Sequence, residues 1–562
     1  MRERGFYGSL ILEQAPRVLS LMDRDALSPT AGCCDRTYWA WKFVDYPGAR
    51  FQEALCAMSF LYATELPGSA FFRNPRLLEW IELGLRFWCS VQYADGSFDE
   101  AYPYERSLAA TAFTTFYVGE ALNFLGDACP PETREQVRRS MSRAGEWLMA
   151  NDERHGFLSN HLAAAAAALY HVYRVTGEER FRARSRHFID KIVAHQSAEG
   201  WYEEYGGADP GYQTHGSFYL ARYCEMSGDA GLAESLARSM RFLAVFVHPD
   251  GSIGGEYASR NTQTYYPAAF EMFAGRCGAA AWIAGKMRDS VRTAAAAGLR
   301  SVDIYNYFPF LNNVVFAYVA CGRPAVPPEE PQRDEPLVWF PKAGMARIRK
   351  PGYDAYVGTA KGGVVKVFAG GKRIYSDCGF IGRLKNGRLF SSQAFDPGRT
   401  TGVAADRIAV EGAFYVIPRP MMKPARFMAF RLFTLTANRV PSFARWLKSL
   451  LVHALIYRRK ALDIRFRRTI DFGDHAITVR DEIAGPDGAR AASLQRGEVF
   501  TTIHMGSSQY FIPNELEPRL GEPEERIDVA QITAGVKLTR AIAIPESSLP
   551  EDRVQCAGFA DS

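Results

Sequence analysis

The chain has 562 residues, which is too long for one ordinary hydrophobic core, so we expect two or three domains. Apolar residues make up 47% and charged residues 23%, values typical of a soluble globular protein rather than a disordered or fibrous one. The net charge is only +5 and no recognised nucleic-acid-binding motif accompanies it, so nucleic acid is not an expected partner.

A glycine-containing turn recurs through the first half of the chain. Three copies occupy residues 93–100, 197–204 and 249–256, and a weaker copy occupies residues 153–161. Each copy carries carboxylates, tyrosines or other polar groups. A turn repeated in this way predicts a repeated unit of structure around it.

A second set of glycines gives the period of the repeat. Gly126, Gly177 and Gly228 are spaced 51 residues apart, and Gly200 and Gly251 keep the same spacing. A period near 50 residues that holds two helical stretches is typical of stacked helix hairpins. Stacking in register puts every copy of the turn on the same rim.

Helical stretches alternate along this repeat. The alanine-rich run at 162–170 is a strong helix former, and 181–196 forms its return helix. The next repeat copies the plan at 218–226 and 232–247. About six such pairs, closing on themselves, predict an α/α toroid over residues 1–321, with an open solenoid as the alternative geometry.

The chain changes character after a linker at 322–336, where five prolines in 15 residues prevent regular structure. Beyond it, short stretches such as 364–368, 464–470 and 475–480 alternate in hydrophobicity with a period of about two. Many short strands of this kind, separated by Gly/Asp turns, predict an antiparallel β-sandwich over residues 337–562.

Positive charge gathers inside this second half. Between Arg419 and Arg468 there are 13 lysines and arginines but one acid, Asp463. The part at 443–460 resembles a basic amphipathic helix that rests on an anionic membrane surface or holds an acidic polymer. The plainer interpretation is a solvated insertion at 419–468 whose apolar side packs on its own domain.

The rim predicted from the repeats carries more polar side chains than a structural repeat needs. These side chains are Glu100, Tyr102, Tyr104, Glu105, Asn160, His161, Glu204, Tyr205, Asp209, Tyr212, His215, Glu256, Arg260 and Asn261.

Two groups of rim residues precede predicted helices. Asn160 and His161 open the alanine-rich helix, where Asn160 is either a site residue or simply the helix cap. Glycines and a proline shape the loop at 203–216, which is either a plain turn or a scaffold for functional groups. Tyr212 and His215 share a face if they open the next helix.

A third group contains Arg260. This arginine either grips a carboxylate through a two-pronged hydrogen bond or pairs with Glu256, four residues earlier.

A helical toroid, a linker and a C-terminal β-sandwich together resemble the heparinase II/III-like and alginate-type polysaccharide lyases. The sharper likeness is the Asn160-His161 pair at the start of one toroid helix, followed one repeat later by Tyr212 ahead of the next. In those enzymes such an Asn-His pair engages the uronate carboxylate, and a tyrosine acts at the sugar carbon. The resemblance implies β-elimination on an acidic polysaccharide or oligosaccharide.

β-Elimination removes a weakly acidic proton next to the uronate carboxylate, so catalysis must neutralise that carboxylate. Asn160, His161 and Arg260 are candidates for this role. Tyr212 is the candidate base, assisted by His215 or His161, because cationic neighbours lower the pKa of a tyrosine from about 10. The proton for the leaving oxygen comes from Tyr212 itself or from Tyr257.

The remaining candidates are expected to bind substrate. Together with Arg260 they are Glu204, Tyr205, Asp209, Glu256, Tyr257, Asn261, Glu100 and Tyr104, and Tyr257 is the second candidate proton donor.

Two features depart from the resemblance. Metal-binding lyases of this group carry a His-rich strand motif, but the comparable stretch at 362–377 has no histidine, so no metal and no other cofactor is expected. The start of the chain has no apolar run of signal-peptide length, and no stretch reaches the roughly 18 apolar residues of a membrane span. This predicts a cytoplasmic protein, peripheral to a membrane if the basic segment binds one, or a periplasmic protein if a leader has been removed.

Three other functions fit the same residues. A glycoside hydrolase on a helical toroid would use two of the carboxylates Glu100, Glu204, Asp209 and Glu256 as acid and base. A uronate epimerase would abstract the same proton and return it from the other face. A polysaccharide-binding protein of envelope or exopolysaccharide assembly would use the rim without chemistry.

Overall fold

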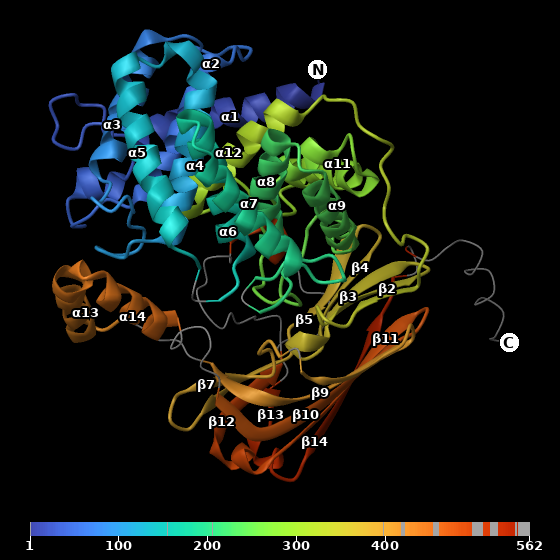
Figure 1. Cartoon of the computed structure of the whole chain (residues 1–562). Helices are drawn as coiled ribbons and strands as arrows, with labels where there is room; N and C mark the ends of the chain where they lie inside the picture. Colours follow the sequence, from blue (N-terminus) through green and yellow to red (C-terminus); the bar gives the residue numbers. More distant parts are fainter. Residues whose placement is uncertain are drawn as a thin grey trace.

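The computed structural model describes residues 2–153, 156–204, 206–396, 398–417, 422–452, 460–496, 510–516, 526–545 and 548. Helices fill its first half and strands dominate its second half (Figure 1). The helices of the first half are α1 (Arg2–Leu21), α2 (Ala54–Ala63), α3 (Pro75–Ser90), α4 (Leu108–Leu125), α5 (Pro131–Ala150), α6 (Ser159–Thr176), α7 (Glu179–Ala194), α8 (Pro210–Ser227), α9 (Ala230–Val245), α10 (Ala268–Phe273), α11 (Gly278–Thr293) and α12 (Ile304–Ala320).

These helices form a closed ring of hairpins. The even-numbered helices contact one another in chain order from α2 to α12, and α12 contacts α2. The odd-numbered helices from α3 to α11 lie outside this ring, and each contacts the next. The closed ring confirms the predicted α/α toroid, and the open solenoid was the wrong alternative.

Composition separates the inner helices from the outer ones. In α6, every residue from Leu162 to Leu169 is fully buried, and α4 is almost as enclosed. A helix that is apolar all round can only be an interior helix, and the six alanines of α6 let its neighbours approach closely. Outer α7 instead buries one stripe, which includes Phe181, Phe188 and Ile192.

The recurrent turn needs its glycine for two reasons. Gly96 and Gly200 have φ angles of 94° and 99°, in the left-handed region that favours glycine. A Cβ at Gly96 would lie 2.1 Å from the carbonyl oxygen of Arg143, and a Cβ at Gly200 would lie 2.7 Å from that of Arg238. Each turn therefore presses directly on the backbone of an outer helix, α5 or α9.

Two antiparallel sheets follow. The first has the order β1-β2-β3-β4-β5, and the second has the order β13-β12-β6-β7-β9-β10-β11-β14 with β8 paired to β9. The strands are β1 (Leu337–Phe340), β2 (Met345–Lys350), β3 (Tyr353–Gly358), β4 (Val364–Ala369), β5 (Lys372–Asp377), β6 (Phe380–Leu384), β7 (Leu389–Ser391), β8 (Thr400–Val403), β9 (Arg407–Ile417), β10 (Lys460–Phe472), β11 (Ala476–Ala484), β12 (Ala491–Arg496), β13 (Arg526–Ile527) and β14 (Val536–Ala543).

The two sheets share a hydrophobic core and one buried cluster of charges. Arg468 of β10 donates to Asp481 of the same sheet at 2.7 Å and to Asp377 of the first sheet at 3.1 Å. Arg496 lies 3.3 Å from Asp481, so two cations face two carboxylates. All four side chains are at most 2% exposed, and a buried charge is tolerated only when it is paired in this way.

The other face of the first sheet packs on the toroid, and the two halves share one hydrophobic core. Lys366 of β4 forms a buried ion pair with Glu256, which lies in the third copy of the turn. Nearby, the ring of His248 stacks on Phe368 with centroids 4.6 Å apart, and its Nε2 atom lies 2.9 Å from the Tyr257 hydroxyl. The sheet is thereby fixed against one side of the ring.

A helical hairpin interrupts the second sheet between β9 and β10. It consists of α13 (Pro424–Thr436) and α14 (Pro441–Val452) and reaches the rim of the toroid (Figure 1). The basic helix predicted over 443–460 is longer than the observed helix. α14 ends at Val452, and Lys460 begins β10. Among the described residues, no helix combines the length and the apolar composition that crossing a bilayer requires.

Candidate functional site

The start of α6 carries the first pair of candidate residues. Asn160 is 1% exposed and lies inside the helix, which begins at Ser159 after Leu158 and has no side-chain cap. The interpretation of Asn160 as the helix cap was therefore wrong. Its backbone N–H instead donates to Oε1 of Glu204 at 3.0 Å, which joins this helix to the loop of the next repeat.

His161 follows on the more open side of the same turn. Its side chain is 20% exposed, and Nδ1 lies 2.9 Å from a carboxylate oxygen of Glu153. Its ring meets the ring of Phe113 edge-on at 5.8 Å. His161 and Tyr212 are 51 residues apart (212 − 161), so the repeat places them at equivalent positions of successive inner helices.

Asp209 organises the start of α8. Its Oδ1 accepts the N–H of Tyr212 at 2.9 Å and so caps the helix. Its Oδ2 accepts the N–H of Arg260 at 2.7 Å, and Arg260 belongs to the equivalent loop of the next repeat, 51 residues later. One carboxylate, fully buried, therefore fixes two loops relative to each other.

This connection brings Arg260 onto Tyr212. The guanidinium carbon of Arg260 lies 3.8 Å from the centroid of the tyrosine ring, within cation–π distance. Arg260 is only 5% exposed, whereas Tyr212 is half-buried and its hydroxyl has no recorded partner among the described residues. Glu256, the alternative partner expected for Arg260, forms its ion pair with Lys366.

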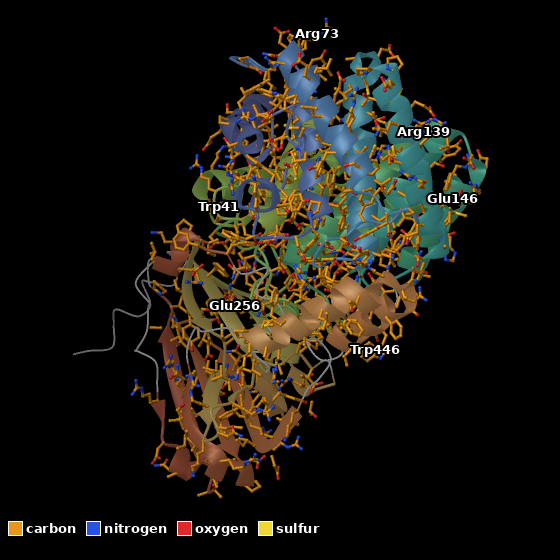
Figure 2. The ribbon with its side chains drawn as sticks, turned by 90° about the vertical axis from the view of Figure 1, so that its left-hand side faces the viewer. Trp41, Arg73, Arg139, Glu146, Glu256 and Trp446 are labelled. Carbon is orange, nitrogen blue, oxygen red and sulfur yellow. The ribbon has the colours of Figure 1, made fainter. Side chains whose placement is uncertain are left out.

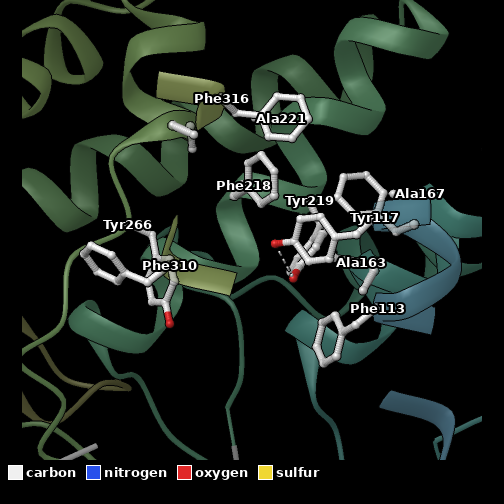
Figure 3. Packing of buried hydrophobic residues seen from close by; sticks show 14 of the residues in the cluster. Phe113, Tyr117, Ala163, Ala167, Phe218, Tyr219, Ala221, Tyr266, Phe310 and Phe316 are labelled. Atoms are coloured by element: carbon white, nitrogen blue, oxygen red, sulfur yellow. Dashed lines mark hydrogen bonds between the residues drawn. The ribbon is translucent and has the colours of Figure 1, made fainter. Parts of the chain in front are cut away.

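His215 lies one turn further along α8, on the same face as Tyr212. It stacks on Tyr266 at 4.4 Å, and its Nε2 lies 3.1 Å from the hydroxyl of Tyr219. The hydroxyl of Tyr219 in turn forms a hydrogen bond with that of Tyr117, and Figure 3 shows these two tyrosines and Tyr266 in the buried core of the toroid. Burial, helped by the positive charges around it, lowers the pKa of His215 well below 6.5, so this imidazole is neutral at pH 7.

Glu204 has an unusual electrostatic state. The side chain is 1% exposed, and its Oε2 has no hydrogen-bond partner among the described residues. Burial raises the pKa of Glu204 to about 8, although Arg260 and the N–H of Asn160 oppose the shift. Near neutral pH this carboxyl group therefore retains its proton beside Asn160 and Arg260.

A second arginine reaches the rim from the segment before α2. Arg50 lies 3.1 Å from Glu100 and 2.7 Å from Glu53, and its guanidinium is 4.7 Å from the centroid of the Phe113 ring. Because His161 packs on the same phenylalanine, Glu100 and Arg50 border the cluster around Tyr212.

Some predicted residues lie elsewhere. Glu256 and Tyr257 serve the contact between the toroid and the first sheet. Tyr104 stacks on Tyr93 at 5.4 Å and lies under Arg439 of the helical hairpin. Asn261 is buried beside Arg260 with a left-handed φ of 61°.

Tyr205 lies outside the described residues.

The cluster that the structure assembles consists of Asn160, His161, Glu204, Asp209, Tyr212, His215 and Arg260.

Three residues that lie around the cluster were not predicted from the sequence. Tyr219 is four residues after His215, and Tyr266 is 51 residues after it (266 − 215), so helical spacing and the repeat period were signals for both. Arg50 gave no signal, because its segment precedes the first clear copy of the turn.

The described residues offer few side chains that could bind a metal ion together. The strand β4 and its flanks, residues 362–377, contain no histidine. In the described part of the chain, no three His, Cys, Asp or Glu side chains gather closely enough to hold an ion.

Comparisons with known proteins agree with this architecture. Residues 76–269, which hold all seven residues of the cluster, match the model of the ulvan lyase N-terminal domain. Comparison with curated protein sequences finds no match.

Among solved structures, the chain is similar to a chondroitin AC lyase from Streptomyces coelicolor A3 in complex with chondroitin sulphate, at 14% identity and a TM-score of 0.54, over 88% of this chain and 69% of that one. It is also similar to a Paenibacillus xanthan lyase, at 10% identity and a TM-score of 0.50, over 87% of this chain and 46% of that one. The domain match and the similarity in fold confirm the predicted resemblance to α/α-toroid polysaccharide lyases.

The role of Asp209 can be tested by an isosteric change. Asp209→Asn places an NH₂ group against at least one of the three backbone N–H groups that donate to this carboxylate, so we expect a loss of about 1–3 kcal/mol in the free energy of unfolding in urea. Asp229→Asn is the control, because Asp229 caps α9 through Leu232, and its other oxygen accepts from the half-exposed side chain of Arg186 on α7 at 2.6 Å rather than from the backbone of a second loop. Equal destabilisation by the two variants would contradict the linking role of Asp209.

The protonated state of Glu204 predicts a pH dependence of stability. The folded state binds one more proton than the unfolded state between the usual pKa of 4.5 and the raised value of about 8. Stability therefore falls as pH rises through this window, by up to about 1.4 kcal/mol for each pH unit.

Glu204→Gln should reduce this slope, by up to about 1.4 kcal/mol for each pH unit, in urea unfolding free energies measured at several pH values across the window. A smaller slope should remain, because burial also raises the pKa of Glu53 to about 7 and that of Asp99 to about 6. Glu203→Gln, one residue earlier and half-buried, should keep the slope. A slope in Glu204→Gln as steep as that of the wild type would contradict the raised pKa of Glu204.

Proposed function

We propose that this protein is a polysaccharide lyase that cleaves a uronate-containing polysaccharide by β-elimination. The single observation that carries the proposal is the placement of the Arg260 guanidinium 3.8 Å over the ring of Tyr212, at the rim of the toroid. The match to the ulvan lyase domain and the fold shared with chondroitin and xanthan lyases support the same reaction class.

The electrostatics of the cluster suit an anionic sugar. Asn160 and His161 lie in the first turn of α6, and Tyr212 lies in the first turn of α8. The positive ends of two helix dipoles and the charge of Arg260 therefore meet at one place, which favours a bound carboxylate. Neutralising that carboxylate stabilises the enolate-like charge that develops when its neighbouring carbon loses a proton.

The proposed reaction balances with groups of the chain. In this reaction the deprotonated oxygen of Tyr212, whose ring lies under Arg260, takes the proton from the carbon next to the carboxylate. The electrons of that C–H bond form a C=C bond, and the adjacent carbon–oxygen bond to the leaving sugar breaks. The leaving oxygen receives a proton, and we assign the newly protonated Tyr212 as its donor. One product end carries an unsaturated uronate.

Neighbouring side chains position the substrate carboxylate and Tyr212. Glu204, which retains its proton near neutral pH, is suited to donate a hydrogen bond to the substrate carboxylate beside Asn160. His215 is neutral and buried, and its ring meets the ring of Tyr212 edge-on at 6.2 Å. We assign His215 to holding the tyrosine in place rather than to proton transfer.

A hydrolase is less well supported. Among the carboxylates available for it, Asp209 is occupied by backbone N–H groups, and Glu256 by Lys366. An epimerase would use the same base as the lyase but would leave the polymer intact. Deuterium uptake from solvent without chain cleavage would identify that reaction.

The base is tested by removing one hydroxyl. Tyr212→Phe should lower the rate of product formation by at least about 100-fold, because proton transfer by a positioned group contributes this much or more. The assay measures the ultraviolet absorbance of the conjugated C=C bond on a panel that includes ulvan, chondroitin sulphate and other acidic polysaccharides.

Tyr173→Phe is the control, since Tyr173 is half-buried on the same type of inner helix, α6, but outside the cluster. Cleavage without an absorbing product would point to a hydrolase. Undiminished absorbance in Tyr212→Phe would contradict the assignment of the base.

A further inference from the structure

Apolar side chains are unusually exposed on the helical hairpin α13–α14. Nine of its large apolar side chains face solvent: Met422 (55% exposed), Phe427 (48%), Met428 (71%), Leu432 (67%), Leu435 (38%), Val440 (50%), Phe443 (50%), Trp446 (56%) and Leu450 (49%). A large group of exposed apolar side chains gathered on one part of a globular protein marks an interaction surface.

The exposed residues follow the geometry of each helix. Met428, Leu432 and Leu435 share one face of α13, because they are spaced by four and three residues. Phe443, Trp446 and Leu450 do the same on α14, with spacings of three and four residues. The two helices also contact each other, since the ring of Phe433 lies 5.8 Å from that of Trp446.

The opposite side of the hairpin is fixed to the toroid. Arg106 donates to the backbone oxygens of Asn438 and Arg439 at 2.8 Å and 3.0 Å. Lys448 lies 3.3 Å from Glu105 in the loop before α4. The ring of Phe430 also packs edge-on against Tyr102 of the toroid. One side of the hairpin is therefore anchored by polar and apolar contacts, and the exposed apolar side chains point away from it, as Figure 2 indicates for the labelled Trp446.

The charges of the hairpin all have one sign. Residues 422–452 contain six lysines and arginines and no aspartate or glutamate. Arg431 and Lys448 pair with acids of the toroid. Lys423, Arg426 and Arg445 are exposed and have no recorded ion pair among the described residues.

We infer that the α13–α14 hairpin binds the surface of an anionic lipid bilayer. An amphipathic helix that carries aromatic and aliphatic side chains beside lysine and arginine lies in the plane of such an interface. The exposed cations attract anionic headgroups, and the apolar side chains enter the boundary with the acyl chains. A soluble acidic polysaccharide would meet the cations but offers nothing to cover the leucines and methionines.

This binding does not depend on the proposed lyase activity. The hairpin surface contains none of the residues of the cluster around Tyr212, and its occupant is a lipid surface rather than the polymer. A protein held in this way would work on a polysaccharide close to a membrane.

The test is sedimentation of the full chain with vesicles. The vesicles are either phosphatidylcholine alone or phosphatidylcholine with roughly 30% phosphatidylglycerol. We expect binding to the anionic vesicles at roughly 0.1 M salt, with weaker binding as salt is raised and the charges are screened.

The decisive variant is the double substitution Leu432→Glu and Leu450→Glu, one exposed residue of each helix, which should lower the apparent affinity for anionic vesicles by at least about tenfold. Both side chains are exposed, so the thermal unfolding midpoint should stay that of the wild type. The matched control is Leu27→Glu with Leu516→Glu, two leucines that are 95% and 78% exposed outside the hairpin.

Three results would overturn the inference. The first is no preference for anionic vesicles. The second is unchanged binding in the double variant, the behaviour of a surface for soluble polyanions. The third is a wild-type dimer in analytical ultracentrifugation that the double variant abolishes, which would assign the surface to a second copy of the chain.

Discussion

The site depends on one buried carboxylate. Asp209 caps α8 through the N–H of Tyr212 and, with its other oxygen, holds the N–H of Arg260 from the loop of the next repeat. The approach is close, because a Cβ at Gly211 would lie only 2.3 Å from the carbonyl oxygen of Thr262. Without this connection, nothing in the helices themselves would bring a cation over the tyrosine ring.

The repeat period made much of this arrangement predictable. Spacing by 51 residues predicted the closed helical ring and the common rim, and it relates His161 to Tyr212 in successive repeats. The predicted strands at 364–368 and 464–470 fall in β4 and β10, and the one at 475–480 begins one residue before β11. Local periodicity is a reliable signal when one face of each element is buried by its neighbours.

The rest was decided by contacts between distant segments. Nothing near Glu256 in the sequence shows that its partner is Lys366, on a strand of the other domain. Arg50 likewise reaches the rim from a segment outside the recognisable repeats. In each case burying an unpaired charge is unfavourable. Glu256 and Arg50 are buried with a partner of opposite charge, whereas Glu204 is buried in its neutral, protonated form.

The central claim is that Tyr212 and Arg260 act as one unit, and a double-mutant cycle tests it most directly. The rates of unsaturated-product formation are compared for Tyr212→Phe, Arg260→Gln and the double variant on one acidic polysaccharide. If the guanidinium works through the tyrosine, each single change removes most of the activity, and the double variant is hardly slower than Tyr212→Phe. Losses that simply multiply in the double variant would show that the two residues act independently and would contradict the coupling of Arg260 to Tyr212.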